Sequence, residues 1–369
     1  MSNIPQGFQK TEVGIIPRDW GVTRLGELSY MKSGETITAK RISEIDTFPC
    51  YGGNGLRGYT SGYTHNGNFA LIGRQGALCG NVQFVNGKFY ASEHAVVVTP
   101  KVGTDIKWLY YMLVDMNLNQ YSESSAQPGL SVAKILRLPI TLPPTKAEQT
   151  AIATALNDAD KLITELEKLI AKKRNIKQGA MQELLRPKEG WEVRPVEELF
   201  DVTAGGDFKK DLSSIIKDEK YCYPVYSNSL VDKGLYGFCS YATSEANCIT
   251  VTARGTIGFA NYRNHKFTAI GRVLVLRPKM EVDCFYISEY INNRIEFVLE
   301  VTGVPQLTAP QISKYLIALP KTKEEQLNIS ETLQDMDAEI EALEKKLEKY
   351  KMLKQGMMQN LLTGEIRLV

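Results

Sequence analysis

The chain has 369 residues, 43% of them hydrophobic and 23% charged, which is typical of a globular protein with more than one core. No apolar run approaches the ~18 residues of a membrane span, and the N-terminus lacks a basic and then apolar leader, so we expect a cytoplasmic protein without a membrane partner. The net charge of +2 excludes a strongly basic chain, so a nucleic-acid binder of this composition must gather its positive charge on one face.

Residues 1–141 form a first block that is expected to be α+β. Segments 68–73, 81–85 and 94–100 predict short strands, because β-favouring residues run there between Gly and Asn turns. An amphipathic helix is predicted over 104–121.

A glycine-rich stretch in this block matches the G-x-G-x-x-G spacing of a dinucleotide cradle at Gly53, Gly55 and Gly58. A cradle needs a helix directly after the loop and an acid about 20 residues on. The following "GYTSGYTHNGN" cannot open a helix, and no Asp or Glu lies between Asp46 and Glu93. The match is therefore interpreted as accidental.

The same loops carry side chains suited to touching a surface. Asn54, Arg57 and Tyr59 are interleaved with glycines, and Arg74 and Gln75 lie on a turn after a predicted strand. Arginine pairs bidentately with guanine, and Asn or Gln with adenine, so these residues are candidate major-groove readers. The alternative is that they brace their own loops or meet phosphates.

Residues 142–185 predict a long helix that acts as a central spacer. Its apolar residues recur at alternating steps of four and three, an a/d heptad stripe with charged residues on the other faces. This seam consists of Ile152, Leu156, Ala159, Ile163, Leu166 and Ile170.

Residues 186–318 form a second α+β block. Strands are predicted within 247–253, 265–270 and 272–278, and one helix over 281–300.

Four residues of the second block are candidate readers. Asn228 and Lys233 lie in the segment expected to correspond to the first glycine loop. Arg254 and Thr256 follow a predicted strand, in a place comparable to that of Arg74.

Residues 319–369 repeat the first long helix. Segment 319–362 aligns with 142–185 without a gap at an offset of 177, with 22 of 44 positions identical. The second seam consists of Ile329, Leu333, Met336, Ile340, Leu343 and Leu347.

A matched pair of stripes predicts a mutual two-helix coil, with a helix on a globular core as the alternative. The first helix leads directly into the second block, and the second helix starts from that block. The shortest course for the second helix is back toward the first block, so antiparallel packing is expected. A stretch such as 145–180 would span roughly 54 Å. The predicted fold is α+β: two pseudo-two-fold-related blocks separated by two long antiparallel coiled-coil helices.

No catalytic pattern accompanies these elements. The chain has no phosphate-binding G-K-[ST], no G-x-S-x-G, no H-E-x-x-H and no Asn/Asp-Pro-Pro-aromatic tetrad. Six scattered cysteines without C-x-x-C predict buried thiols, and three histidines without ligand spacing predict no metal site. We therefore expect a non-enzyme, either a nucleic-acid reader or a protein-interaction scaffold with two adhesive heads.

The two helices and their flanks resemble one family. "LPP…EQ…I…L…D…I…LE", the closing "KQG-M-Q-LL" and "TGEIRL" near the C-terminus are similar to the specificity (S) subunits of type I restriction-modification systems. "FPCYGGNG", "GRQGALCG" and "ARGTIG" resemble recurrent motifs of that family's target-recognition domains.

The resemblance implies a non-catalytic reader of a bipartite DNA site, in which each recognition domain binds one half of the target. It implies double-stranded DNA, two methyltransferase (M) subunits docked on helices 145–180 and 322–357, and restriction motor-nuclease (R) subunits as partners. S-adenosylmethionine, ATP and Mg would belong to those partners, leaving no cofactor in this chain.

Overall fold

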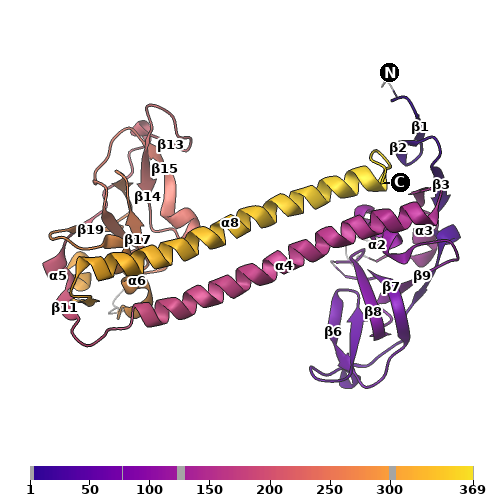
Figure 1. Cartoon of the computed structure of the whole chain (residues 1–369), viewed down its shortest axis with the longest axis horizontal. Helices are drawn as coiled ribbons and strands as arrows, with labels where there is room; N and C mark the ends of the chain where they lie inside the picture. The colour runs from indigo at the N-terminus through magenta and orange to yellow at the C-terminus, as the bar shows by residue number, and fades with distance from the viewer. Residues whose placement is uncertain (1–3, 77, 123–128, 299–304, 369) are drawn as a thin grey trace. The chain divides into compact units, whose positions relative to one another are not determined.

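The computed structural model describes residues 4–76, 78–122, 129–298 and 305–368. The chain divides into two compact units, one made of residues 1–167 and 345–369 and the other of residues 168–344. Each unit holds an α+β head together with one segment of each of two long helices, α4 (Lys146–Leu184) and α8 (Lys323–Leu362), as Figure 1 shows. The division therefore cuts both helices internally.

The head of the first unit is built on a six-stranded sheet of order β4-β9-β7-β8-β5-β6. Its neighbours pair antiparallel, except that β5 and β8 are parallel where Cys50 faces Tyr90. The strands are β4 (Ser29–Ser33), β5 (Phe48–Gly52), β6 (Gly55–Thr60), β7 (His65–Gly73), β8 (Val82–Ala91) and β9 (Ala95–Pro100).

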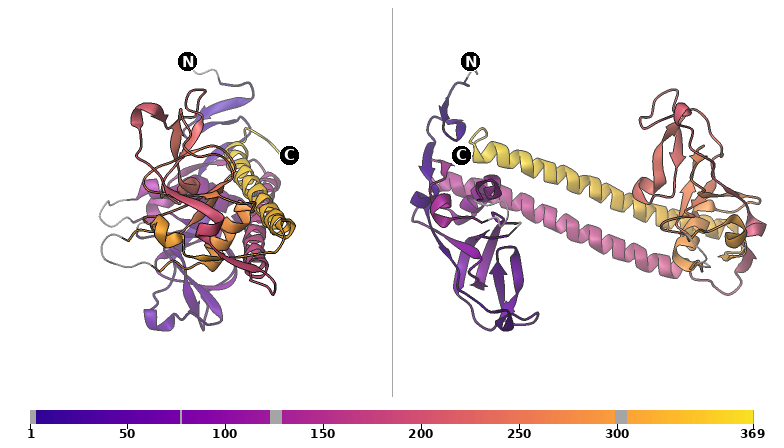
Figure 2. Two further views of the ribbon diagram at one scale, coloured as in Figure 1. Left: turned by 90° about the vertical axis from the view of Figure 1, so that its left-hand side faces the viewer. Right: turned by 180° about the vertical axis from the view of Figure 1, so that it is seen from behind.

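The helix predicted over 104–121 is present as α2 (Ile106–Asp115) followed by a single 3₁₀ turn, Leu118–Tyr121. It begins at Asp105, whose carboxylate accepts from the backbone N–H of Lys107 and Trp108, and it ends before Asn117, which adopts a left-handed conformation. Its buried face packs on strands β7, β8 and β9 of this sheet. The right-hand view of Figure 2 shows the chain from behind.

The core of the first head includes residues from both long helices. Ile152 and Leu156, near the start of α4, share one buried cluster with Leu361 and Leu362 at the end of α8. The fully buried Trp108 of α2 belongs to the same cluster. The first head is therefore completed by residues far along the chain.

The second head has two four-stranded sheets, of order β12-β19-β16-β17 and β13-β15-β14-β18. The parallel pairing of β14 with β18 matches that of β5 with β8 in the first head. The strands are β12 (Phe200–Ala204), β13 (Ser213–Ser214), β14 (Tyr223–Tyr226), β15 (Leu235–Cys239), β16 (Cys248–Val251), β17 (Ala260–Arg263), β18 (Thr268–Ala269) and β19 (Leu274–Pro278).

The predicted second-block helix is shorter than expected. The sequence predicted 281–300, whereas α6 spans Cys284–Arg294, begins at the capping carboxylate of Asp283 and ends where Ile295 turns to extended backbone. Positions 299 and 300 lie outside the described residues. The core again includes residues of both long helices: Ile329 and Leu333 of α8 are buried in it, and Leu184 of α4 packs against it.

Short elements close each head. The two-stranded ribbons β3 (Gly21–Arg24) with β10 (Pro139–Leu142), and β11 (Glu192–Pro195) with β20 (Leu316–Leu319), join the beginning and end of each block. The other elements are β1 (Phe8–Thr11), β2 (Gly14–Pro17), α1 (Leu25–Leu28), α3 (Val132–Leu136), α5 (Val196–Leu199), α7 (Ala309–Ile312) and the 3₁₀ turns Ala39–Arg41, Lys210–Leu212 and Val231–Gly234.

The two long helices pair through matched ion pairs within each unit. In the first unit Lys354 meets Asp160 at 2.5 Å and Lys351 meets Glu167 at 3.2 Å.

In the second unit the same two pairs recur 177 residues away, as Lys177 with Asp337 and Arg174 with Glu344, both at 2.5 Å. Residue numbers rise along one helix as they fall along the other, which confirms the antiparallel pairing predicted from connectivity.

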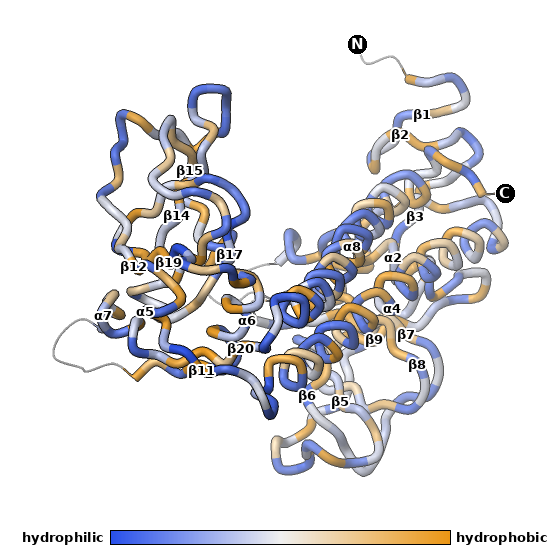
Figure 3. Tube along the Cα trace, turned by 60° about the vertical axis from the view of Figure 1, so that its left-hand side comes forward, coloured by the Kyte–Doolittle hydropathy of each residue, from blue (hydrophilic) through white to orange (hydrophobic). Residues whose placement is uncertain are grey.

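Apolar and charged residues alternate along both helices, as Figure 3 shows by hydropathy. Of the seam predicted for α4, Ile152, Leu156, Leu166 and Ile170 are buried, and Ala159 and Ile163 are half-buried. On α8, Ile329, Leu333, Ile340 and Leu347 are buried, and Met336 and Leu343 are half-buried.

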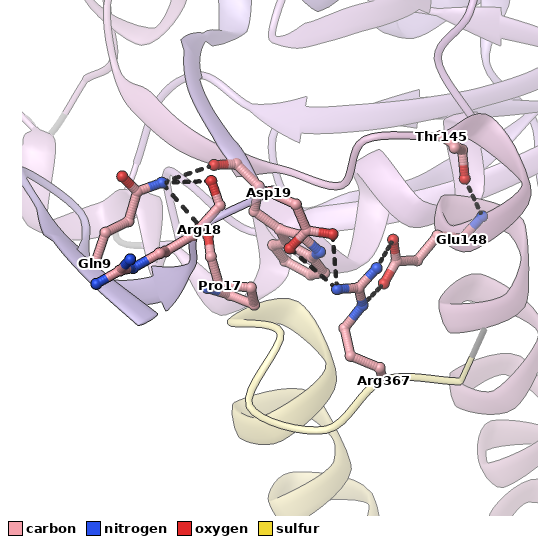
Figure 4. A network of polar contacts seen from close by, with 8 residues as sticks. Gln9, Pro17, Arg18, Asp19, Thr145, Glu148 and Arg367 are labelled. Carbon is pink, nitrogen blue, oxygen red and sulfur yellow. Dashed lines mark hydrogen bonds and ion pairs between the residues drawn. The ribbon is translucent and has the colours of Figure 1, made fainter. Parts of the chain in front are cut away.

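The segment after α8 returns to the beginning of the first head (Figure 4). The Arg367 guanidinium donates to both carboxylate oxygens of the buried Glu148 of α4, and its Nη1 lies 3.0 and 3.2 Å from the two oxygens of Asp19. Gly364, at a φ of +74°, lies against Pro17 and Trp20, where a Cβ would clash. This tail is therefore fastened to the chain start by packing and by charge.

The cysteine prediction is wrong at one position. Cys50, Cys79, Cys239, Cys248 and Cys284 are buried free thiols, whereas Cys222 is exposed in the segment just before β14. Burial raises the pKa of Cys284 to about 12, which keeps that thiol protonated. In the described part of the chain, no helix combines the length and apolarity that crossing a membrane requires.

Candidate nucleic-acid interface

The glycine-rich stretch of the first head is a β-hairpin. Gly53 and Asn54 connect β5 to β6, and Gly55 and Gly58 lie within β6. A strand rather than a helix follows the glycines, so no helix N-terminus is available to hold a pyrophosphate.

The glycines allow two loops to pack directly against each other. A Cβ on Gly73, at the end of β7, would lie 2.0 Å from the carbonyl oxygen of Gly53. A Cβ on Gly53 would in turn lie 3.1 Å from the carbonyl oxygen of Gln75. Side chains at these positions would separate the hairpin turn from the turn after β7, so the glycines bring the candidate readers together.

The hairpin side chains differ in their freedom. Asn54 and Arg57 are exposed, with the Arg57 stem lying over Gly52. Tyr59 is half-buried, and both its backbone N–H and its carbonyl are hydrogen-bonded to the backbone of Ser43.

Arg74 and Gln75 lie on the turn after β7 but point differently. Arg74 is half-buried and donates from Nη1 to the Ser33 hydroxyl at 3.2 Å, a bracing contact. Gln75 is exposed, and its backbone pairs with that of Gly129. Asn54, Arg57 and Gln75 are therefore the accessible polar groups of the first loop pair.

In the second head the turn between β14 and β15 corresponds to this hairpin, because both strand pairs adjoin the parallel pairing described above. Asn228 in this turn accepts from the N–H of Ala253 at 2.7 Å and donates to the carbonyl of Gly271 at 2.6 Å. Both ends of its amide are occupied, so Asn228 braces the turn. Lys233 is exposed in a left-handed conformation, with a φ of +49°.

Arg254 and Thr256 are exposed after β16, but Arg254 does not occupy the position of Arg74. The N–H of Leu130 bonds the carbonyl of Arg74, and the N–H of Leu307 bonds that of Ala253, so Arg254 corresponds to Gln75. The sequence comparison was one residue out, because Arg254 follows Arg74 by 180 residues whereas the two heads are offset by 179 residues at this turn. The Arg254 guanidinium donates to Gln306 Oε1 at 2.8 and 3.1 Å.

The sequence did not predict several residues that hold these loops in place through hydrogen bonds. Ser33 and Gln306 hold two of the candidate arginines, and Arg263 of β17 reaches the carbonyl of Lys233 at 2.6 Å. None belongs to a local motif, and only the strand register relates them to the loops. Among the described residues, no group of three or more His, Cys, Asp or Glu side chains could hold a metal ion.

Two α+β heads with corresponding strand pairings and surface loops, each packed against segments of the same two antiparallel helices, define a duplicated module. The chain belongs to the type I restriction modification DNA specificity domain family, Methylase_S, whose model matches it twice, over residues 17–178 and 188–351. It is a DNA specificity subunit of a type I restriction-modification system, a non-catalytic class.

Relatives include the type I restriction enzyme EcoprrI specificity subunit of Escherichia coli, 48% identical over 152 residues, which cover 39% of this chain and 38% of that protein. The MjaX specificity subunit of Methanocaldococcus jannaschii, described as putative, is 26% identical over 98% of this chain and 97% of that protein. The family model and the MjaX relative thus match most of the chain, whereas the 48% identity is confined to part of it.

Solved structures show the same fold. The crystal structure of the type I restriction-modification S subunit from M. genitalium matches 93% of this chain and 96% of its own, with a TM-score of 0.71 and 16% identity. A chain from a study of complex assembly and conformational transition of the type I system matches 95% of this chain and 99% of its own, with a TM-score of 0.56 and 16% identity.

Proposed function

We propose that each head reads one half of a bipartite DNA target. Residues 1–141 and 186–318 would be the two target-recognition domains, and helices 142–185 and 319–369 the spacers. The observation that carries the proposal is the duplication: two heads with the same strand pairings present their loop pairs from corresponding places. A protein with one recognition surface needs no second copy.

The accessible readers are proposed to be Asn54, Arg57 and Gln75 in the first head and Lys233 and Arg254 in the second. Arginine and lysine suit guanine, and Asn and Gln suit adenine, in the major groove. Tyr59, Arg74 and Asn228 would position these loops, given the contacts or partial burial described above, and the exposed Thr256 would be a further reader. The chain is only weakly basic, so partner subunits would share the phosphate contacts.

The helices are proposed to set the distance between the half-targets. The 39 residues of α4 correspond to roughly 58 Å of helix at 1.5 Å per residue. Half-sites read from one side of B-DNA lie about 34 Å apart, one helical turn. A helix of this length is sufficient to define such a gap.

The same helices are proposed to dock the two M subunits. Helix α4 leaves Leu162, Leu169 and Ile176 about two-fifths to one-half exposed, at steps of seven residues. Met352 and Leu353 are more than half exposed on α8. Apolar rows outside the seam suit packing against further helices.

The R subunits would join this assembly, and S-adenosylmethionine, ATP and Mg would act in the M and R partners. The assembled complex would bind DNA in the cytoplasm.

Mapping of methylated adenines in cells carrying this chain with its M and R partners tests the proposal. We expect one split motif, and exchange of residues 18–141 for the corresponding block of another specificity subunit should change one half only. A continuous motif would contradict the proposal. A gel shift with pooled duplexes, with and without the M subunit, separates it from a protein-interaction scaffold, which would shift none.

A further inference from the structure

The two heads can be superposed residue by residue through their strand registers. Ile72 faces Val82 in the first head, as Val251 faces Ala260 in the second. By the same register Val85 corresponds to Arg263, since they face Phe69 and Cys248 respectively.

In the first head the corresponding interior is apolar. Val85 is 5% exposed and Leu71 is 3% exposed, and they share one buried cluster. By register the second head places Thr250 where Leu71 lies. An apolar pair has therefore become a polar pair at equivalent buried positions.

Arg263 is 4% exposed, and its contacts lead to the surface turn. Its Nε donates to the Thr250 hydroxyl at 2.9 Å, and its Nη2 donates to the carbonyl of Lys233 at 2.6 Å. The guanidinium carbon lies 3.4 Å from the centre of the Tyr226 ring, whose hydroxyl bonds His265 at 2.8 Å. The charge of Asp232, in the same turn as Lys233, acts on Arg263, but among the described residues no carboxylate forms an ion pair with it.

A buried guanidinium without an ion pair is costly compared with an apolar pair, so its retention requires a reason other than packing. Burial lowers the pKa of Arg263 to about 10, so the charge is kept at neutral pH. What the charge does is hold the carbonyl of Lys233.

The turn it holds is the other large difference between the heads. Tyr51 pairs with Leu56 and Tyr226 pairs with Leu235, so the first turn spans residues 52–55 and the second spans 227–234. The second turn is thus four residues longer.

The longer turn contains two consecutive strained residues, Asp232 and Lys233, at φ values of +47° and +49°. Non-glycine residues in this region persist only where the surroundings hold them. The turn also exposes an apolar side chain, Val231, which is 79% exposed. A valine beside a lysine matches two features of the major groove, the thymine methyl group and the guanine acceptors.

We propose that the 227–234 turn is the specificity-determining element of the second head and that buried Arg263 is the residue that positions it. This inference rests on the proposed function and names the part of the second head that reads bases. The first head, with its short glycine turn and apolar Leu71–Val85 pair, reads DNA without such a support.

The test uses the complete complex with M subunits and the double variant Thr250→Leu/Arg263→Val, which installs the first head's apolar pair. Methylation is measured on a library of duplexes randomised in both half-targets. We expect discrimination in one half-target to fall about tenfold while the other half is read as in the unaltered complex. Arg277→Met is the matched control, because Arg277 also bonds a loop carbonyl of this head, that of Thr243, and it should change neither half.

The surface variants Val231→Ala and Lys233→Ala test the turn without altering the interior, and decide the matter if the double variant fails to fold. Each should relax particular positions of the same half-target. An unchanged motif in these variants overturns the inference. A uniform loss of affinity for all sequences, with a salt dependence reduced by about one unit, would assign Lys233 to a phosphate and overturn it as well. If the unaltered complex shows no split motif, the proposed function itself fails.

Discussion

Replacement of Arg367 by alanine should destabilise the first unit more than any exposed ion pair of that unit would. The side chain of Glu148 is 1% exposed and both its oxygens accept from Arg367, so the variant leaves a buried carboxylate without its cation. Removal of one partner of a buried pair costs about 3–5 kcal/mol.

Two features set the value at the lower end of this range. Arg367 is itself 33% exposed, which admits water to the vacated position. Its second partner, Asp19, is 57% exposed and contributes at most about 1 kcal/mol. We therefore expect a loss of about 3 kcal/mol. For a unit of this size that corresponds to a fall in Tm of about 6–12 °C.

The assay is thermal unfolding followed by circular dichroism, with two companion variants. Arg24→Ala breaks an exposed pair with Glu12, and should cost less than about 1 kcal/mol. The double variant Glu148→Gln/Arg367→Met removes both charges and should recover part of the loss. A Tm for Arg367→Ala within 2 °C of the unaltered protein would refute the reasoning, as would a double variant less stable than the single one.

Three further predictions concern the helices and the second head. Insertion of one heptad after Glu167 and another after Glu344 keeps the antiparallel register and lengthens the spacer by about 10 Å. The gap in the methylated motif should then widen by about three base pairs. A constant gap would contradict the spacer role. Charged substitutions at Leu169 and Ile176 should reduce co-purification of the M subunit without lowering the Tm, and unchanged co-purification would place docking elsewhere. Burial raises the pKa of Glu289 against the opposing effect of Lys177, so ionisation of Glu289 destabilises the fold as the pH rises through the normal range for Glu. Glu289→Gln should therefore raise the Tm at pH 7.5 and leave it unchanged at pH 3.5. An equal change in Tm at both pH values would argue against burial as the cause.

The long helices were predictable because their signal is local and repeated. A heptad stripe states which face is buried, and the 177-residue repeat supplies a matched partner, so connectivity fixes the direction of pairing. The dinucleotide reading could be rejected for a similar reason, because the residues after Gly58 favour strands.

The loop supports could not be predicted, because each is a contact between distant strands. Arg263 looks unremarkable in "NYRNHK", and only the facing of β16 and β17 shows that it replaces a buried valine. The same holds for Asn228, a candidate reader by residue type whose amide is taken up by Ala253 and Gly271. Residue type indicates what a side chain could bind, and tertiary contacts decide whether it is available.

The inclusion of Leu361 and Leu362 in the first head's interior has a consequence for synthesis. The strands of that head leave the ribosome some 200 residues before these leucines, a delay of roughly 10–40 s at usual elongation rates. During this interval the nascent head exposes an incomplete apolar surface. A chain that stops before these two leucines therefore leaves the core of the first head incomplete.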